Sequence, residues 1–395
     1  MFLGCSAKLI PLRRPGKAVC GTFTIMAAIM MLPLFPGCTG KEAERMMDEA
    51  DSLIVSRPEF ALAILDDIPR SGRSRGANEA RYNMLRTEAA YRALDDTIIP
   101  DSAIAASVNY YTRKDDKANA ARARYYLAML KMQRNEHSAA AVDLLMAEND
   151  ARQSSVSHFQ KGLIYRGLGE CFEEFYDMPT SITYQKRAYK EFMSSKDSLY
   201  AGYALAVIAA RYLDLRKNHE CIQYAKKASE FGLNLKEDNL YIFANLLIAD
   251  RFVYNDKSED AIKIFCKLHS IDSTKFKEKD YVNWGYAYIL NGEIENARRC
   301  NTHVKELERA MNSIDVNILL HEGRYKECSE LLISTFDILD SVKYTIWTRN
   351  DLSVINDYYN MQRQESQQML EKEKTRRNTI IIISILTINS SLKFE

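Results

Sequence analysis

The chain has 395 residues, of which 47% are hydrophobic, and its 54 basic and 53 acidic residues leave a net charge of +1. This apolar content is enough for a packed core and excludes disorder over most of the length. The basic stripe that nucleic-acid-binding proteins usually carry is missing, so we expect no nucleic-acid partner. Glycine (15 residues) and proline (8 residues) are scarce, and no run of alternating residues predicts a strand. We therefore expect an all-α fold.

Residues 1–38 are typical of an export segment. Arg13 and Arg14 precede a mostly apolar stretch over residues 18–35, and Cys38 follows three residues later. The segment resembles a bacterial lipoprotein signal, and the resemblance implies that the Cys38 thiol carries a diacylglyceryl group. Two acyl chains are enough for stable anchoring in a membrane. Ordinary cleavage without lipid and an uncleaved anchor are the alternatives.

A pattern of two helices recurs roughly every 40 residues over residues 39–345. The clearest copy has Tyr165 and Gly169 on its first helix and Ser181 and Ala188 on its second. The small residues that open the successive second helices are Ala61, Ala103, Ala140, Ser181, Cys221, Ala261, Ala297 and Cys328. Because two antiparallel helices cannot bury their apolar faces alone, successive pairs are expected to stack into one continuous core. We predict about seven to eight helix pairs with degenerate end copies, and a generic helical bundle is the alternative.

Little in the sequence predicts catalysis. The six histidines form no His-Glu-x-x-His motif, and no phosphate-binding glycine loop occurs. The segment 72–76 matches Gly-x-Ser-x-Gly, but a nucleophile elbow requires a strand before the serine, so a basic loop between helices is the simpler interpretation. The cysteines in the repeats lack metal or redox spacing, and core packing is expected for them. We predict a protein that is not an enzyme, without cofactor or metal site.

Two further segments follow the repeats. Residues 346–378 form a predicted polar, coiled-coil-like helix, and residues 379–395 comprise a short apolar segment and a polar tail. The apolar run 379–388 would make roughly 15 Å of helix, about half of a bilayer core. We interpret it as a truncated transmembrane helix. A hydrophobic tail that packs against the repeats is the alternative.

The small and aromatic positions of the repeats resemble those of tetratricopeptide (TPR) units, although most copies are longer than the roughly 34 residues of a standard unit. The whole layout resembles a family of TPR lipoproteins and TPR transmembrane proteins common in Bacteroidetes. Residues 46–53 and 57–66 are similar to the opening repeat of that family, and residues 374–383 are similar to the approach to its membrane helix. The resemblance implies a TPR-like right-handed solenoid with a C-terminal extended helix, anchored in the cell envelope with a periplasmic repeat domain.

We therefore expect a membrane-tethered, exported TPR scaffold that binds a protein or peptide partner in its concave groove. Carried over by position in the first helices, the predicted groove residues are Arg122, Tyr125, Gln133, Arg166, Glu170, Glu173, Tyr203, Asp214, Asp250 and Tyr254. Solvated helix-face residues are the alternative interpretation of each. One other function is a truncated transmembrane sensor whose helix over residues 351–377 transmits an extracytoplasmic signal. Another is a glycan-capture lipoprotein, although Trp284 and Trp347 are the only tryptophans.

Overall fold

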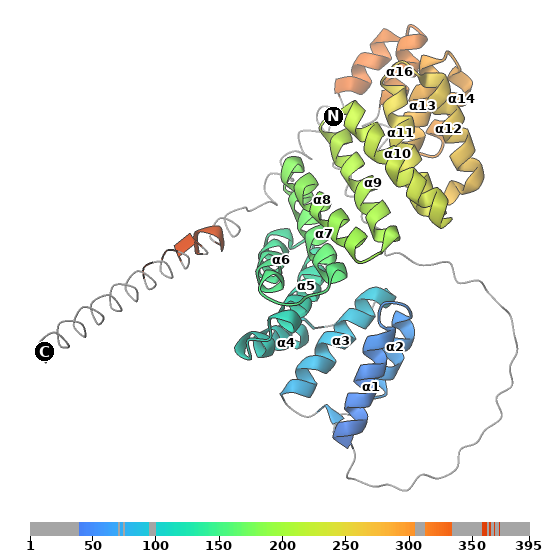
Figure 1. Cartoon of the computed structure of the whole chain (residues 1–395). Helices are drawn as coiled ribbons and strands as arrows, with labels where there is room; N and C mark the ends of the chain where they lie inside the picture. Colours follow the sequence, from blue (N-terminus) through green and yellow to red (C-terminus); the bar gives the residue numbers. More distant parts are fainter. Residues whose placement is uncertain are drawn as a thin grey trace, which may run out of the picture.

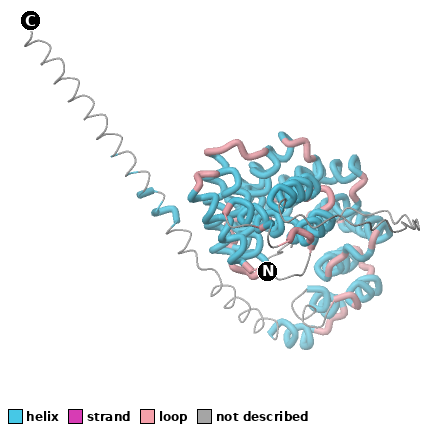
Figure 2. Tube along the Cα trace, turned by 90° about the horizontal axis from the view of Figure 1, so that it is seen from below, coloured by secondary structure: helices cyan, strands magenta, loops and turns pink. Residues whose placement is uncertain are grey.

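The computed structural model describes residues 39–69, 72–73, 76–94, 100–304, 313–333, 358–361, 363–364, 367 and 371. Within these residues all regular structure is helical, as Figure 2 shows, which confirms the all-α prediction. The predicted export segment with Cys38 and the apolar run 379–388 lie outside the described residues. None of the described helices combines the length and the apolar character needed to cross a membrane.

The helices stack in chain order from α1 to α16 (Figure 1). Odd-numbered helices pack on the next odd-numbered helix at several steps (α1 on α3, α3 on α5, α5 on α7, α9 on α11 and α11 on α13) and form the inner layer. The inner helices are α1 (Thr39–Leu53), α3 (Ala77–Ala93), α5 (Lys117–Gln133), α7 (His158–Glu174), α9 (Ser198–Asp214), α11 (Asp238–Val253) and α13 (Glu278–Leu290).

The even-numbered helices form the outer layer, each packed between its neighbours in the chain. They are α2 (Pro58–Asp66), α4 (Asp101–Arg113), α6 (His137–Arg152), α8 (Met178–Ser194), α10 (Asn218–Leu235), α12 (Ser258–Ile271) and α14 (Ile294–Asn301). A short 3₁₀ helix, η2 (Ser273–Lys275), precedes α13, and α16 (Ser313–His321) packs on α13 and α14. Residues 325–333 form a further helical segment.

The small residues predicted to open the second helix of each pair lie where expected in every copy but one. In those copies the predicted residue is the fourth of its helix and is buried, as with Ala140, Ser181 and Cys221. In α4 the prediction of Ala103 is wrong, because Ile104 is the buried fourth residue and Ala103 is only half-buried. The reason is that Pro100 is extended and caps the helix, so α4 begins at Asp101, one residue later than the pattern implied.

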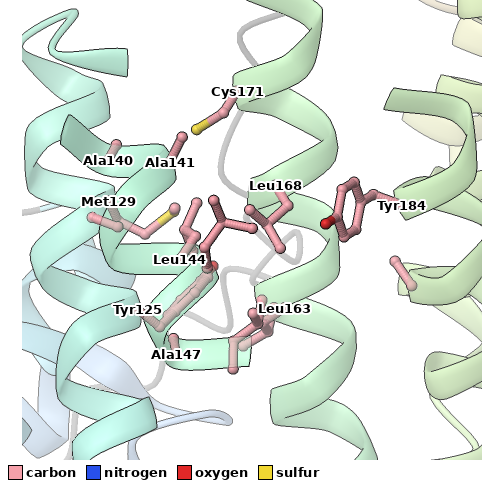
Figure 3. Packing of buried hydrophobic residues seen from close by; sticks show 14 of the residues in the cluster. Tyr125, Met129, Ala140, Ala141, Leu144, Ala147, Leu163, Leu168, Cys171 and Tyr184 are labelled. Carbon is pink, nitrogen blue, oxygen red and sulfur yellow. The ribbon is translucent and has the colours of Figure 1, made fainter. Parts of the chain in front are cut away.

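Close approach between α7 and α8 depends on glycine. Ser181 of α8 donates a hydrogen bond of 2.7 Å to the carbonyl of Gly169 on α7. A Cβ at Gly169 would lie 2.6 Å from the Gln185 side chain, and one at Gly162 would lie 2.5 Å from Phe192. Figure 3 shows the core beside this contact, where Leu168 of α7 faces Leu144 of α6. Small residues at the crossing let the large side chains fill the space on either side.

Sharp turns separate the helices. Between α7 and α8, the backbone of Tyr176 is in the left-handed region, with φ of 59°. The amide of Asp177 then donates a hydrogen bond of 2.9 Å to the carbonyl of Phe172. The Asp177 carboxylate then caps α8 by accepting from the amide of Thr180 at 3.1 Å. In the part of the chain that the structure describes, the non-glycine residues with positive φ are Leu94, Asp115, Asn135, Tyr176, Lys196, Arg216, Lys236 and Asp256. Because this region costs energy for an L side chain, the turns depend on the bonds around them.

Candidate functional site

A row of charged side chains runs along the inner helices. Its members, which we call the inner charged row, are Glu88, Arg122, Arg166, Glu170, Glu173, Arg211, Asp214, Asp250 and Arg251. On α7 they recur as Arg166, Glu170 and Glu173, a spacing that puts them on one side of the helix. Six of the ten predicted groove residues belong to this row. The row is therefore the candidate partner-binding surface.

The first part of the row joins three inner helices. Arg122 of α5 donates to Glu88 of α3 at 2.7 Å and to Asp51 of α1 at 2.7 Å. Glu88 also accepts from Arg92 at 2.8 Å, and Arg92 donates to the hydroxyl of Tyr126 at 3.1 Å. Two guanidinium groups and two carboxylates are thus mutually neutralised. This part of the row holds α1, α3 and α5 together and offers little free charge to a partner.

Arg166 of α7 occupies the next position. It pairs with Glu170 at 3.3 Å and donates to the hydroxyl of Tyr125 on α5 at 3.2 Å. Tyr125 itself is only 1% exposed, so its prediction as a surface groove residue is wrong. Figure 3 shows its ring in the core beside Leu144. A tyrosine ring is long enough to be buried as a hydrophobic body while its hydroxyl reaches a polar partner, and position along the helix could not separate the two ends.

Carboxylates outnumber guanidinium groups between α7 and α9. Arg211 of α9, which is 1% exposed, forms ion pairs with Glu173 and, at 3.2 Å, with Asp214. Burial raises the pKa of Glu173 to about 8, against the opposing effect of Arg211. Burial likewise raises the pKa of Glu170 and of Asp214, each opposed by its arginine. In each of these carboxylates the buried oxygen that faces an arginine is held by an ion pair, without a well-directed hydrogen bond. Two arginines thus serve three carboxylates, and the charge of this surface is acidic.

The last part of the row adds an aromatic surface. Asp250 of α11 accepts from Arg251 at 2.7 Å and from Asn283 of α13 at 2.8 Å. The Arg251 guanidinium lies 5.0 Å from the centroid of the Tyr254 ring, which is 55% exposed. Tyr286 of α13 lies beside Tyr254, with ring centroids 5.9 Å apart. A charged group and two tilted, neighbouring rings therefore lie together, a combination suited to an amphipathic peptide.

Two predicted groove residues lie apart from the row. Gln133 is exposed at the C-terminal end of α5 and is not part of the inner charged row. Tyr203 is partly buried against the hydrophobic cluster of α9, α10 and α11. Residues that the sequence did not identify include Arg211, Arg251 and Glu88. The signal for them was weak, since a charged residue in an inner helix becomes informative only when the partner from the next repeat is known.

The other side of α7 carries a small pocket of about 80 Å³. It is lined by Glu148, Ala151, Arg152, Lys161, Ile164, Tyr165 and Glu191 of α6, α7 and α8. Lys161 and Tyr165 point away from Arg166 and Glu170 by their helical spacing. No group of three or more histidine, cysteine, aspartate or glutamate side chains in the described part of the chain could hold a metal ion. Gly72 and Arg73 of the Gly-x-Ser-x-Gly match lie between α2 and α3, with no strand among the described residues around them.

No protein-family model matches the sequence, and no curated protein matches it. Solved structures do share its architecture. A Rap protein complexed with competence and sporulation factor aligns with a TM-score of 0.51 at 13% identity, over 84% of this chain and 99% of that chain. NprR in complex with its cognate peptide NprX aligns with a TM-score of 0.51 at 14% identity, over 83% of this chain and 98% of that chain. The fold is an all-α, TPR-like helical solenoid.

Aspartyl phosphate phosphatase F from Bacillus subtilis is a third structure similar to this TPR-like solenoid, with a TM-score of 0.50 at 14% identity, over 88% of this chain and 96% of that chain. At such low identity, the likeness establishes the fold alone, and the activity in the name of a similar structure is that protein's own. The inner charged row is therefore described from this chain's own residues.

Proposed function

We propose that this chain is a binding scaffold that holds a protein or peptide partner on the inner charged row. The observation that carries the proposal is the group of three carboxylates between α7 and α9, which share two arginines and so leave an excess of acidic groups. Two of the similar solved structures are complexes, one with a competence and sporulation factor and one with a peptide, which supports a partner of this kind. Binding rather than catalysis is the function that these residues support.

The partner that fits is a segment with a basic group next to an aromatic or apolar residue. The basic group would be placed among Glu170, Glu173 and Asp214, where three carboxylates face two arginines. The apolar neighbour would contact Tyr254. Because a cation favours the ionised form of a carboxyl group, binding would displace a proton from Glu173. Affinity is then expected to rise as the pH increases towards about 8.

The test is binding of a peptide library to the immobilised full chain, followed by affinity measurement for the captured peptides. Asp214→Asn removes a charge but keeps the shape, and is expected to weaken binding by about ten-fold, equivalent to about 1.4 kcal/mol. Glu259→Gln, an exposed position on α12, is the matched control and should bind as the wild type does. If Asp214→Asn binds every captured peptide with unchanged affinity, the site is wrongly assigned.

Export and membrane tethering are part of the same proposal and depend on Cys38. The Cys38→Ser variant should move from the membrane pellet to the soluble fraction of the cell envelope and should no longer incorporate labelled fatty acid. A variant that stays in the pellet without label would identify the apolar run 379–388 or an uncleaved signal as the anchor. The residue next to it, Thr39→Ser, is the control, because it leaves the thiol in place.

One observation favours the sensor alternative over glycan capture. Tyr358, which belongs to the segment that would transmit a signal, packs into the hydrophobic cluster of the middle repeats. Glycan capture by stacking needs exposed aromatic platforms. Trp284 instead packs against Phe265, with ring centroids 5.9 Å apart, in a partly buried aromatic cluster.

A further inference from the structure

A tyrosine from the far end of the chain is buried in the middle of the repeats. Tyr358 is only 6% exposed and belongs to the hydrophobic cluster built mainly from α5, α6, α7 and α8. The preceding described helical segment, residues 325–333, and α16 belong to the C-terminal end of the array, whereas α6 and α8 lie in its middle (Figure 1). Residues 358–361 are helical. Tyr358 therefore contacts repeats that are remote from it in the sequence.

The receiving surface is made by α6 and α8. Its centre is Glu148 of α6, a buried carboxylate that lies 3.5 Å from the hydroxyl of Tyr184 and 3.4 Å from Arg187, both on α8. Burial raises the pKa of Tyr184, and the neighbouring hydroxyl of Tyr359 adds to this effect. Burial, with Glu148 nearby, raises the pKa of Tyr358 to about 12, so its hydroxyl stays neutral on this surface.

The pattern of exposure on the C-terminal helix matches a one-sided contact. Tyr358 is buried, whereas Tyr359 is 47% exposed and Met361 is 43% exposed. A helix that only passed near the repeats would leave all three side chains open to solvent. A tyrosine that loses nearly all of its exposed surface contributes substantially to a contact, because aromatic rings bury large apolar areas.

We propose that the outer surface of α6 and α8 is the docking site of the chain's own C-terminal helix, with Tyr358 as its buried anchor and Tyr359 as its polar contact. The occupant is this segment because the segment itself lies there, with its buried residue on the core and its hydroxyl on Tyr184. The inference does not depend on the proposed partner binding.

Docking at this place gives the C-terminal helix a physical link to α7. The ring of Tyr184 stacks on Phe172 of α7, with centroids 5.6 Å apart and an interplanar angle of 12°. The opposite side of α7 carries Arg166 and Glu170 of the inner charged row. A displacement of α7 relative to α8 would alter the position of Tyr184 and hence its contact with Tyr359. The contact between the C-terminal segment and α8 therefore depends on how the middle repeats pack.

The experiment is hydrogen exchange of the full chain, comparing wild type with Tyr358→Ala. Peptides that cover residues 358–364 should exchange faster by about ten-fold or more in the variant, and the peptide of α8 that contains Tyr184 should also lose protection. Peptides of α10 to α13 should not change. Tyr325→Ala is the matched control, because Tyr325 is exposed and lies outside the dock; it should leave residues 358–364 protected.

Tyr184→Phe provides a second variant that keeps the ring on Phe172 and removes only the hydroxyl. It should raise exchange of residues 358–364 by a smaller factor than Tyr358→Ala does. Equal exchange of these residues in wild type and Tyr358→Ala would overturn the proposal. Protection that disappears on dilution, together with a dimeric mass at high concentration, would also overturn it, because the helix would then dock on a second copy.

Discussion

The replacement Glu173→Gln tests the electrostatics of the surface between α7 and α9. In the folded chain the pKa of Glu173 is about 8, against an ordinary value of 4.5. Between these two values the native state keeps a proton that the unfolded state has lost. Stability therefore falls as the pH rises through this window. At 1.36 kcal/mol per pH unit, the loss between pH 4.5 and pH 8 amounts to roughly 4 kcal/mol.

Glutamine mimics the protonated carboxyl group and cannot ionise. The free energy of unfolding of Glu173→Gln should equal that of the wild type near pH 4, within about 0.5 kcal/mol. Near pH 8.5 it should exceed that of the wild type by about 2–4 kcal/mol. Urea denaturation followed by circular dichroism at both pH values measures the difference. Glu259→Gln, which removes an exposed carboxylate, should show no such change with pH. An equal difference between wild type and Glu173→Gln at both pH values would refute the reasoning.

Four further replacements test the backbone geometry in the same denaturation assay. Tyr176→Gly should stabilise the chain by about 0.5–1 kcal/mol, because glycine relieves the left-handed conformation. Asn135→Gly should have a smaller effect, since asparagine tolerates that conformation, and an equal gain at both positions would contradict the argument. Gly232→Ala should destabilise by about 1–2 kcal/mol although alanine favours helices, because its Cβ would lie 2.6 Å from the amide nitrogen of Tyr241. Gly40→Ala on α1, with no atom within 4 Å of its Cβ, should not destabilise, and a loss as large as that at Gly232 would show that the backbone clash is not the cause.

The repeat pattern predicted most of the fold because it follows from local rules. Most outer helices have a small residue at their fourth position, where two helices cross closely, and Ala140 and Cys221 show this directly. The error at Ala103 came from a single helix start that Pro100 delays by one residue. The left-handed turns escaped prediction, because residues such as Tyr176 stand where glycine would have given a clear signal.

The candidate site was predictable only in part, for a physical reason. A position along a helix tells which side a residue faces, and this identified Arg166, Glu170 and Glu173 on α7. It does not tell which charge of another helix will meet it, so Arg211 was missed. The packing of Tyr358 against the middle repeats could not be predicted either, since no local rule relates that residue to α6 and α8.

Site-specific crosslinking in cells tests partner binding on the inner charged row most directly. A photoreactive phenylalanine analogue in place of Tyr254 faces the proposed partner, and the same analogue in place of Tyr325 is exposed but lies away from the row. The proposal predicts a discrete crosslinked protein or peptide at position 254 that is reduced in Asp214→Asn and absent at position 325. Crosslinks at 325 with none at 254 would contradict it, and would place the partner on another surface of the solenoid.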